Sequence, residues 1–302
     1  MSYKHSKHIA ITGVNGFVGK HLTRELAKND ISVIGIGREA TVDSQISGLL
    51  SDYFVADLSQ KWPELPNVDA VIHLAGLAAV APSFDDPQSY IAVNSSMVTH
   101  MAEYYLEVNK KPRLLVVSSG AIYDPDQAMP LTEASTVGFS SPYAVSKILV
   151  ENQCRYYRTR GLDCVIVRPF NHIGPGQLGG FLVPDVIKQL QSGESLTVGN
   201  ITTKRDYTDV RDIAHAYYLL ATAPTLNHVV YNACAGTSVS GEDIVERLKQ
   251  LTHKQNAQVK VDQSKIRPTD PADIYGDASA LTADTGWVPK ISLEQTLTDT
   301  VG

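Results

Sequence analysis

Three closely spaced glycines after the first apolar run limit the possible fold more than any other feature of the chain. The segment "ITGVNGFVGKHL" puts Gly13, Gly16 and Gly19 between a short β-branched run and a stretch with helical spacing. The first glycine permits a tight turn, the second lets the backbone approach a pyrophosphate, and the third allows close packing of helix on sheet. The N–H groups that begin the helix then face the phosphates. The sequence therefore predicts a strand–turn–helix that binds a dinucleotide.

Short apolar runs alternate with amphipathic stretches through the first half of the chain. Segments such as "AVIHLA" and "RLLVVSS" are apolar on both faces, which is typical of strands covered on both sides. The alternation predicts an α/β fold with a Rossmann-type, doubly wound parallel sheet. Strands are expected at residues 9–12, 32–36, 53–56, 70–74, 114–118 and 163–168, and helices at 17–29, 88–107 and 142–160.

The second part of the chain lacks this regular alternation. Helices are expected at residues 183–192, 210–221 and 241–252, among loops and short strand candidates. No linker-like stretch stands out, so a second lobe would be built directly on the first sheet. We predict a dinucleotide-binding domain of residues 1–169 with 207–233, and a smaller C-terminal substrate-binding lobe of residues 170–206 and 234–302.

Charge and composition argue against several classes of function. The 302 residues carry 26 basic and 32 acidic side chains, a net charge of −6, without a Lys/Arg block, which argues against a nucleic-acid groove. No apolar run approaches the roughly 20 residues of a membrane span, and no signal-peptide pattern precedes the first strand. The three cysteines form no CxxC pair and are expected to be reduced. These features predict a cytoplasmic protein that binds neither nucleic acid nor membrane.

Three aspartates, Asp206, Asp209 and Asp212, are spaced three residues apart. The segment does not supply a set of histidine and cysteine ligands with them. A helix N-cap with solvated acids is therefore expected, and no metal site.

The end of the second expected strand bears on the choice between the two nicotinamide cofactors. A protein that selects NAD usually has an acid there for the ribose 2′-hydroxyl, but "VIGIGRE" offers Gly37 and Arg38, with Glu39 as the only nearby acid. An arginine can pair with a 2′-phosphate, which favours NADP(H). If Arg38 instead stacks on the adenine, NAD(H) remains acceptable.

A tyrosine and a lysine one helical turn apart form the candidate acid–base centre. In "SSPYAVSKILVEN", Tyr143 and Lys147 fall on one face of the expected helix. A fixed ammonium nearby is expected to lower the phenol pKa from its free value near 10 and to make Tyr143 a usable proton donor. Ser119 would hydrogen-bond the same substrate oxygen. A solvated helix face and a satisfied strand-end serine are the simpler alternatives.

These segments together resemble the extended short-chain dehydrogenase/reductase family, the NAD-dependent epimerases, dehydratases and reductases of nucleotide sugars. The resemblance covers essentially the whole chain and includes "GVNGFVG", "HLAG", "SSGAIYD", "YAVSK" and "RPFNHIGPGQ". The last of these, with "VGNITTKRDYTDVRD" and "IRPTDPADIYGD", looks most like GDP-4-keto-6-deoxymannose reductases. The resemblance implies an NAD(P)-dependent oxidoreductase whose smaller lobe binds a nucleotide-diphosphate sugar.

The resemblance also implies which residues bind the ligands. Asp57 would meet the adenine, and helices 88–107 and 142–160 would pair across a two-fold axis in a homodimer, with Tyr104, Tyr105, Tyr156 and Tyr157 as candidates for that surface. The cofactor would contact Gly13, Asn15, Gly16, Phe17, Val18, Gly19, Arg38, Asp57, Leu58, Leu74, Ala75, Gly76, Tyr143, Lys147 and Pro169. The substrate would contact Ser119 and Asn171, with Arg205 and Arg267 clamping its diphosphate.

The turn after Ser119 distinguishes the possible reactions. Family dehydratases have Asp-Glu, or at least Glu, directly after the catalytic hydroxyl, whereas this chain has Gly120 and Ala121. The acid and base for elimination are missing, so hydride transfer remains. With NADP(H) favoured, we expect a reductase that delivers hydride to C4 of a 4-keto-6-deoxy sugar, GDP- or dTDP-linked, while Tyr143 donates the proton. The alternative is an NAD-dependent nucleotide-sugar C4 epimerase.

Overall fold

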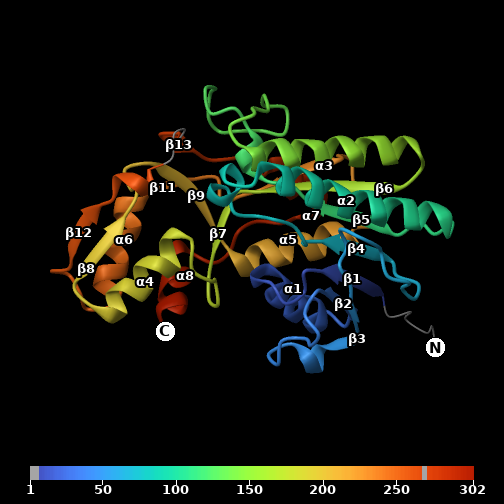
Figure 1. Cartoon of the computed structure of the whole chain (residues 1–302), viewed down its shortest axis with the longest axis horizontal. Helices are drawn as coiled ribbons and strands as arrows, with labels where there is room; N and C mark the ends of the chain where they lie inside the picture. The colour runs from blue at the N-terminus through green and yellow to red at the C-terminus, as the bar shows by residue number, and fades with distance from the viewer. Residues whose placement is uncertain (1–6, 267–270) are drawn as a thin grey trace.

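A computed structural model describes residues 7–266 and 271–302 of the chain. Its centre is a seven-stranded sheet in the order β3-β2-β1-β4-β5-β6-β10, and every neighbouring pair is parallel (Figure 1). The predicted doubly wound α/β fold is therefore confirmed. The strands are β1 (His8–Thr12), β2 (Ser32–Gly37), β3 (Leu50–Val55), β4 (Ala70–His73), β5 (Arg113–Val117), β6 (Asp163–Pro169) and β10 (Val230–Ala233).

Both faces of this sheet are buried because its strands are apolar on both sides. In β1, Ile9 and Ile11 belong to one hydrophobic cluster, whereas Ala10 between them belongs to the cluster on the other face. Helices α1 (Phe17–Lys28), α5 (Val210–Thr222) and α7 (Ser279–Thr285) cover the first face. Helices α2 (Pro87–Glu107) and α3 (Pro142–Thr159) lie side by side over the second (Figure 1).

The strand order reverses at β1. This strand pairs with β2 on one side and with β4 on the other. In open parallel sheets, ligands bind in the crevice outside the carboxyl ends of the strands at such a reversal. The glycine-rich turn after β1 and the loop after β4 are in contact at this reversal, at Gly13 and Ala75, and the turns after β5 and β6 lie on the same edge of the sheet.

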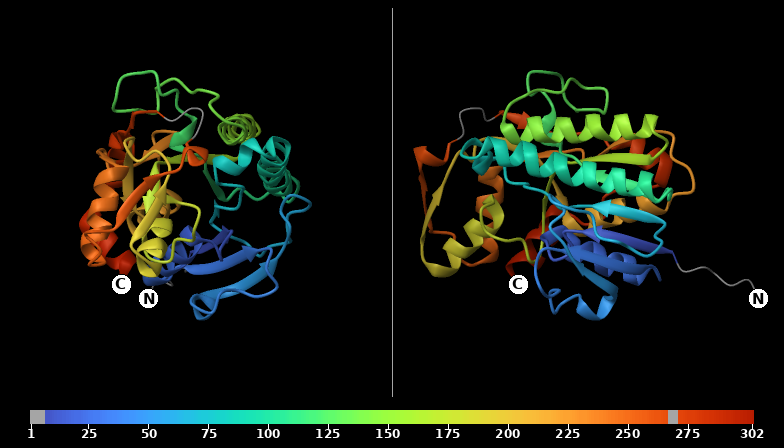
Figure 2. Two further views of the ribbon diagram at one scale, coloured as in Figure 1. Left: turned by 60° about the vertical axis from the view of Figure 1, so that its left-hand side comes forward. Right: turned by 45° about the vertical axis from the view of Figure 1, so that its right-hand side comes forward.

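A smaller lobe adjoins this edge (Figure 2). It contains a sheet of β11-β9-β13 with β7 paired to β9, and a parallel pair β12-β8. Its apolar core lies among α4, α6, α8 and these strands. The division into two domains at the boundaries given above stays a prediction. The elements of the lobe are β7 (Asn171–Ile173), α4 (Leu182–Ser192), β8 (Ser195–Val198), β9 (Lys204–Asp209), β11 (Ser238–Ser240), α6 (Gly241–Leu251), β12 (Gln258–Val261), β13 (Asp273–Ile274) and α8 (Leu293–Val301). Within the described residues, short 3-10 helices occur at η1 (Ser47–Leu49), η2 (Ala81–Phe84), η3 (Gly120–Ile122) and η4 (Gln263–Lys265).

The three regularly spaced aspartates connect the lobe to the central sheet. Asp209 is the N-cap of α5 as predicted, but the expectation of solvated acids is wrong, since Asp206, Asp209 and Asp212 are only 1%, 2% and 6% exposed. Asp206 accepts hydrogen bonds from the backbone N–H groups of Ala235 at 2.7 Å, Gly236 at 2.9 Å and Gly276 at 3.4 Å. Its carboxylate thus joins β9 to the segments that follow β10 and β13.

The predicted elements differ from the structure mainly at their ends. Strand β3 begins three residues before its predicted start, because its first residues, Leu50–Asp52, are half-buried or exposed and lack the apolar pattern used to find strands. Within the described residues, no helix combines the length and the apolar character that crossing a membrane requires.

Candidate active site

The glycine-rich turn leaves no room for side chains at two positions. Gly13 has a φ of +69°, and a Cβ there would lie 3.1 Å from the amide nitrogen of Ala75 in the loop after β4. A Cβ on Gly19 would lie 2.4 Å from the carbonyl oxygen of Gly13 and 2.5 Å from that of Val14, well inside contact distance. The turn therefore packs backbone on backbone, and α1 begins directly after it with Gly16 as its N-cap, so the first N–H groups of the helix have no partner within the helix. This cradle fits the diphosphate of a dinucleotide.

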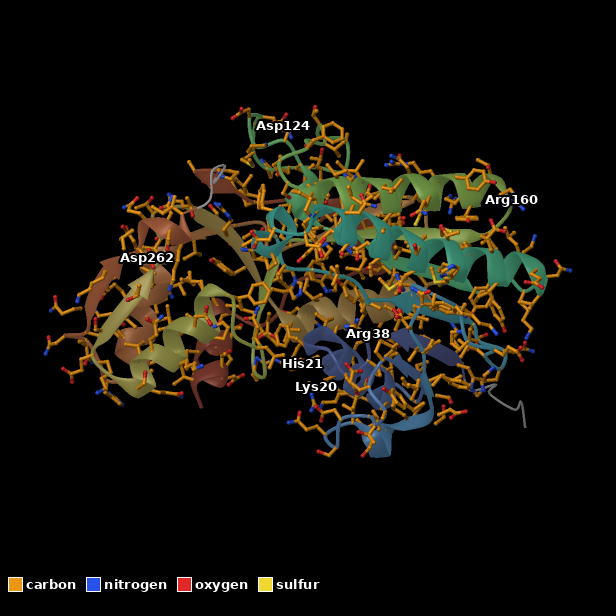
Figure 3. The ribbon with its side chains drawn as sticks, in the orientation of Figure 1. Lys20, His21, Arg38, Asp124, Arg160 and Asp262 are labelled. Atoms are coloured by element: carbon orange, nitrogen blue, oxygen red, sulfur yellow. The ribbon has the colours of Figure 1, made fainter. Side chains whose placement is uncertain are left out.

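The end of β2 presents two side chains of opposite charge. Arg38 is exposed, and Figure 3 shows it in the same region of the view as Lys20 and His21. A Cβ on Gly37 would lie 2.9 Å from a carboxylate oxygen of Glu39, so this acid reaches back over the last residue of the strand. The sequence alone did not predict that the Glu39 side chain folds back over Gly37.

Asn15 of the phosphate turn connects it to Glu39. Its amide donates to the Glu39 carboxylate at 3.1 Å, and its side-chain oxygen accepts from the Asp43 amide at 2.9 Å. The hydroxyl of Tyr53 donates to the Glu39 carbonyl at 2.7 Å. The pKa of Glu39 is lowered, first by its own backbone N–H and then by the Asn15 amide and the Arg38 charge. The acid is therefore ionised at neutral pH.

The loop after β4 is fixed by Thr12 and His73. The Thr12 hydroxyl accepts from the Ala75 N–H at 3.0 Å and is hydrogen-bonded to His73 Nδ1 at 2.9 Å. Burial and the charge of Lys147 lower the pKa of His73 to about 3, so the ring is neutral. Leu74 and Gly76 continue this loop, and a Cβ on Gly76 would lie 3.7 Å from Lys147 Nζ. Two further predicted cofactor residues follow β3. Leu58 is buried, and Asp57 is exposed, with a pKa lowered first by hydrogen bonds from Ser59 and also by the Arg38 charge.

Ser119, Tyr143 and Lys147 come together at the carboxyl ends of β5 and the start of α3. Ser141 caps α3 by accepting from the Ala144 N–H at 3.1 Å, which puts Tyr143 in the first turn of the helix. Lys147 Nζ lies 5.9 Å from the centroid of the Tyr143 ring and donates to the Val117 carbonyl at 2.8 Å. A side-chain hydrogen bond joins Tyr143 and Ser119. The predicted catalytic set is thus assembled in space.

The ionisation of this centre differs from the sequence-based expectation. Burial raises the pKa of Tyr143 to about 12, opposed by the Ser119 hydrogen bond, so the expected lowering by Lys147 is wrong for this structure. Burial also lowers the pKa of Lys147 to about 8, because the ammonium loses solvation. At neutral pH both groups are therefore mainly protonated. The sequence pattern gave the pairing but not the degree of burial, which decides the direction of both shifts.

The turn after Ser119 holds no carboxylate. Gly120 and Ala121 begin η3, and a Cβ on Gly120 would lie 3.0 Å from the ring of Phe170. The backbone of this turn therefore packs directly on the segment that follows β6. Asp124 lies beyond the turn, on the loop that rises above the start of α3 (Figure 3).

The segment after β6 connects the glycine-rich helix with the lobe. The ring of His172 stacks on Phe17 with centroids 6.2 Å apart and planes 9° from parallel. His21 Nε2 lies 2.9 Å from the Pro175 carbonyl oxygen. No local sequence pattern indicates this aromatic stack, because Phe17 and His172 are far apart along the chain.

The predicted substrate residues occupy separate parts of this region. Asn171 is exposed at the start of β7, and Pro169 is buried at the end of β6. Arg205 on β9 is half-buried and donates to the carbonyl oxygens of Lys204 and Pro271, each at 2.7 Å. Arg267 lies outside the described residues.

Known proteins resemble this chain along almost its entire length. The model of the NAD dependent epimerase/dehydratase family matches residues 9–234, which contain the glycine-rich turn, Ser119, Tyr143 and Lys147. A GDP-6-deoxy-D-mannose reductase of Pseudomonas aeruginosa is 32% identical, over 97% of this chain and 95% of its own. A UDP-glucose 4-epimerase of Caenorhabditis elegans is 26% identical, over 97% of this chain and 96% of its own. RMD from Pseudomonas aeruginosa, solved in complex with NADPH, matches with a TM-score of 0.80 and 29% identity over 98% of both chains.

The buried ammonium of Lys147 should reduce the stability of the folded protein at neutral pH. Its pKa of about 8 lies below the ordinary 10.5, and each pKa unit corresponds to about 1.4 kcal/mol. Replacing it by methionine removes this cost but leaves the Val117 carbonyl without its donor, at about 1 kcal/mol. We expect Lys147→Met to raise the free energy of unfolding by about 2–3 kcal/mol at pH 7.

The stability difference between Lys147→Met and the wild type should depend on pH. Between about pH 8 and pH 10.5 the unfolded chain retains a proton that folded Lys147 has lost, so the wild type gains stability as the pH rises. The advantage of Lys147→Met should therefore vanish across that window, as followed by urea unfolding at each pH. Lys188→Met, at an exposed position of α4, is the matched control. A variant less stable than the wild type at pH 7 would contradict the expectation.

Proposed function

The chain belongs to the NAD dependent epimerase/dehydratase family, and from that premise we propose that it is an NADP(H)-dependent reductase of a nucleotide-linked 4-keto-6-deoxy sugar. One observation carries the proposal: Ser119, Tyr143 and Lys147 converge beside a turn, Gly120–Ile122, that holds no carboxylate. Such a site can move a hydride and a proton, but it lacks the acid and base that elimination of water requires.

The side chains divide the work at the C4 carbonyl. A bound nicotinamide would supply the hydride. Tyr143, whose pKa of about 12 keeps it protonated, would donate its proton to the C4 oxygen. Ser119 would donate a hydrogen bond to the same oxygen as negative charge develops on it. The ammonium of Lys147 would then stabilise the phenolate that Tyr143 becomes. Burial of the centre strengthens each of these electrostatic interactions.

The two charged residues after β2 bear on the cofactor. In the proposed enzyme, Arg38 pairs with the 2′-phosphate of NADP(H), because it is exposed at the end of β2 and precedes Glu39, which Asn15 joins to the phosphate turn. The RMD structure, a complex with NADPH, supports the same choice. Glu39 would be the ribose ligand if the cofactor were NAD(H), since its ionised carboxylate lies over Gly37.

The nucleotide-diphosphate sugar would extend from Ser119 into the lobe. Asn171, exposed at the start of β7, would contact the sugar, and Arg205 with Arg267 would bind the diphosphate. The GDP-6-deoxy-D-mannose reductase relative favours a GDP-linked substrate over a dTDP-linked one.

The second candidate function is an NAD-dependent C4 epimerase, which the UDP-glucose 4-epimerase relative and the position of Glu39 support. An epimerase keeps its nicotinamide through the cycle, whereas a reductase exchanges it at each turnover. Cofactor that stays bound to the purified protein through gel filtration would favour the epimerase.

Reduction of a 4-keto sugar tests the proposed activity directly. NADPH is offered with GDP-, dTDP- and UDP-linked 4-keto-6-deoxyhexoses, and absorbance loss is followed with NMR of the product. We expect turnover with at least one of them, and a loss of about 10²–10⁴ in kcat for Tyr143→Phe, which removes the proton donor. Tyr104→Phe, in the last turn of α2, is the control. Turnover by Tyr143→Phe at the wild-type rate would refute the proposed mechanism.

The cofactor choice is tested by two neighbouring substitutions. Arg38→Ala should raise the KM for NADPH by about 10–100-fold and leave that for NADH nearly unchanged, because charge-assisted hydrogen bonds contribute about 1.5–3 kcal/mol. Glu39→Gln should change neither constant much. Arg160→Ala, at the far end of α3, is the control (Figure 3). A selective loss of NADH use in Glu39→Gln, with Arg38→Ala silent, would support the epimerase instead.

The proposed enzyme is a homodimer formed through α2 and α3. Tyr105 and Tyr157, which the sequence left as surface candidates, are 2% and 4% exposed and belong to the core under these helices. Leu149 and Tyr156 are seven residues apart on α3 and are 37% and 51% exposed, which suits an outer apolar stripe.

Light scattering after gel filtration measures this association. We expect the wild type at twice the mass of one chain and Leu149→Glu at the mass of one, because a buried unpaired carboxylate would oppose the contact. Val288→Glu, which is 45% exposed at a position remote from these helices, should stay dimeric. A wild-type protein of single-chain mass would exclude the dimer.

A further inference from the structure

We propose that Glu151 and Arg168 are a positioning pair for the active site, which hold the Ser119 turn at its working distance from Tyr143 and Lys147. The inference rests on the proposed function, since it concerns the same site. Neither residue is needed to touch substrate or cofactor. The pair would act through the backbone on either side of Ser119.

The pair lies in the protein interior, and its contact with the surface is Arg155 of the same helix, which is 50% exposed and has Nη2 3.4 Å from the Glu151 carboxylate. Both side chains are 2% exposed. Arg168 binds the Glu151 carboxylate with two parallel bonds, from Nε at 2.8 Å and from Nη2 at 2.7 Å. Such a bidentate arrangement fixes the relative orientation of the two planes as well as their distance. Because Glu151 belongs to α3 and Arg168 to β6, the pair locks that helix to the sheet at the edge where the site lies.

Two further bonds connect the pair to the turn that carries Ser119. The hydroxyl of Ser118 donates to the Glu151 carboxylate at 2.7 Å. At the other end of the turn, Arg168 Nη1 donates to the Tyr123 hydroxyl at 2.8 Å, and its guanidinium lies 4.8 Å from the centroid of that ring. The residues on either side of Ser119–Ile122 are therefore anchored to the same ion pair. The position of the Ser119 hydroxyl follows from these two anchors.

The same pair also places the helix that carries the acid–base residues. Tyr143, Lys147 and Glu151 follow at intervals of four residues and share one face of α3. Anchoring Glu151 thus fixes the rotation of α3 about its axis, on which the direction of Tyr143 depends. The same ion pair then holds both Ser119, which follows β5, and Tyr143 of α3 in position relative to each other.

Hydrogen bonds continue from Tyr123 through Asn232 and Glu133 and return to Arg168. The Tyr123 hydroxyl donates to the side-chain oxygen of Asn232 at 2.7 Å, and the Asn232 N–H donates to the Glu133 carboxylate at 2.6 Å. Arg168 also reaches the Glu133 carbonyl at 3.2 Å. Buried ion pairs contribute little net stability compared with apolar residues of the same volume, because of the cost of removing them from water. Precise placement of the turn is a role that apolar packing would fill less well.

The pKa of Lys147 is sensitive to the charge of Glu151. Lys147 is faced by His73 from β4 and by Tyr143, Glu151 and Cys154 from its own helix. The negative charge of Glu151 raises the pKa of Lys147 and so opposes the effect of burial. A variant that neutralises Glu151 while Arg168 stays charged should therefore bring Lys147 to deprotonate at lower pH.

The test compares Ser118→Ala, Tyr123→Phe and Glu151→Gln with the wild type in steady-state reduction from pH 6 to pH 10. Each of the first two removes one anchor and leaves the ion pair intact. We expect each to lower kcat about 5–20-fold with the KM for both substrates within twofold. Glu151→Gln should lower kcat at least as much and move the alkaline limb of kcat/KM to lower pH.

Two matched controls separate positioning from general stability. Ser240→Ala removes a buried serine bonded to an acid, Asp243, in the lobe. Asp163→Asn breaks the Arg113–Asp163 pair, which joins β5 and β6 at the opposite end of the same strands at 2.9 Å. Both should lower the melting temperature while kcat stays within twofold. The proposal is overturned if the controls lose kcat as much as the three variants do, or if the three variants keep wild-type kcat and pH profile.

Failure of the proposed function would look different, as a wild-type protein without turnover on any sugar offered. The positioning can then be read from the Lys147 pKa by NMR of lysine-labelled protein. A downward change in Glu151→Gln, absent in Asp163→Asn, supports the pair, and no change refutes it. If the wild type does turn over but Glu151→Gln does not fold, Ser118→Ala and Tyr123→Phe decide through kcat.

Discussion

The close approach of the first turn to the end of β4 is the constraint on which the active site depends. Gly13 and Gly19 allow backbone to touch backbone where any side chain would fall within 2.4–3.2 Å of another residue's main chain. This contact brings the loop of Leu74–Gly76 beside the start of α1 and, through Gly76, beside Lys147. A cofactor held by the turn would therefore lie against the acid–base residues without further rearrangement.

Burial then determines the ionisation of the centre. Tyr143 and Lys147 are 6% and 7% exposed, and loss of solvation moves their pKa values apart, to about 12 for Tyr143 and about 8 for Lys147. Both groups are still mainly protonated at neutral pH, which is the state that a proton donor for reduction needs. A site built to abstract a proton would require the opposite arrangement, with solvent or a second charge to stabilise the phenolate.

The sequence predicted the elements that depend on local pattern. The glycine spacing, the two-sided apolar strands and the four-residue interval from Tyr143 to Lys147 each follow from a periodicity that can be read along the chain. The position of Glu39 over Gly37, the stack of His172 on Phe17 and the Glu151–Arg168 pair could not be predicted in that way. Each depends on residues brought together by the sheet order, and one sequence does not contain that proximity. The pKa of Tyr143 was predicted in the wrong direction for the same reason, since burial is a property of the assembled molecule.

The Asp206 carboxylate has a mechanical consequence for the lobe. It accepts from backbone donors of two segments far apart in the chain, and its own strand, β9, carries the lobe's sheet. Sliding of one sheet past the other would strip a desolvated acid of its donors, at a cost that rotation about the same point avoids. Any closing of the lobe over a substrate would therefore be a swing with this carboxylate as its pivot, rather than a shear.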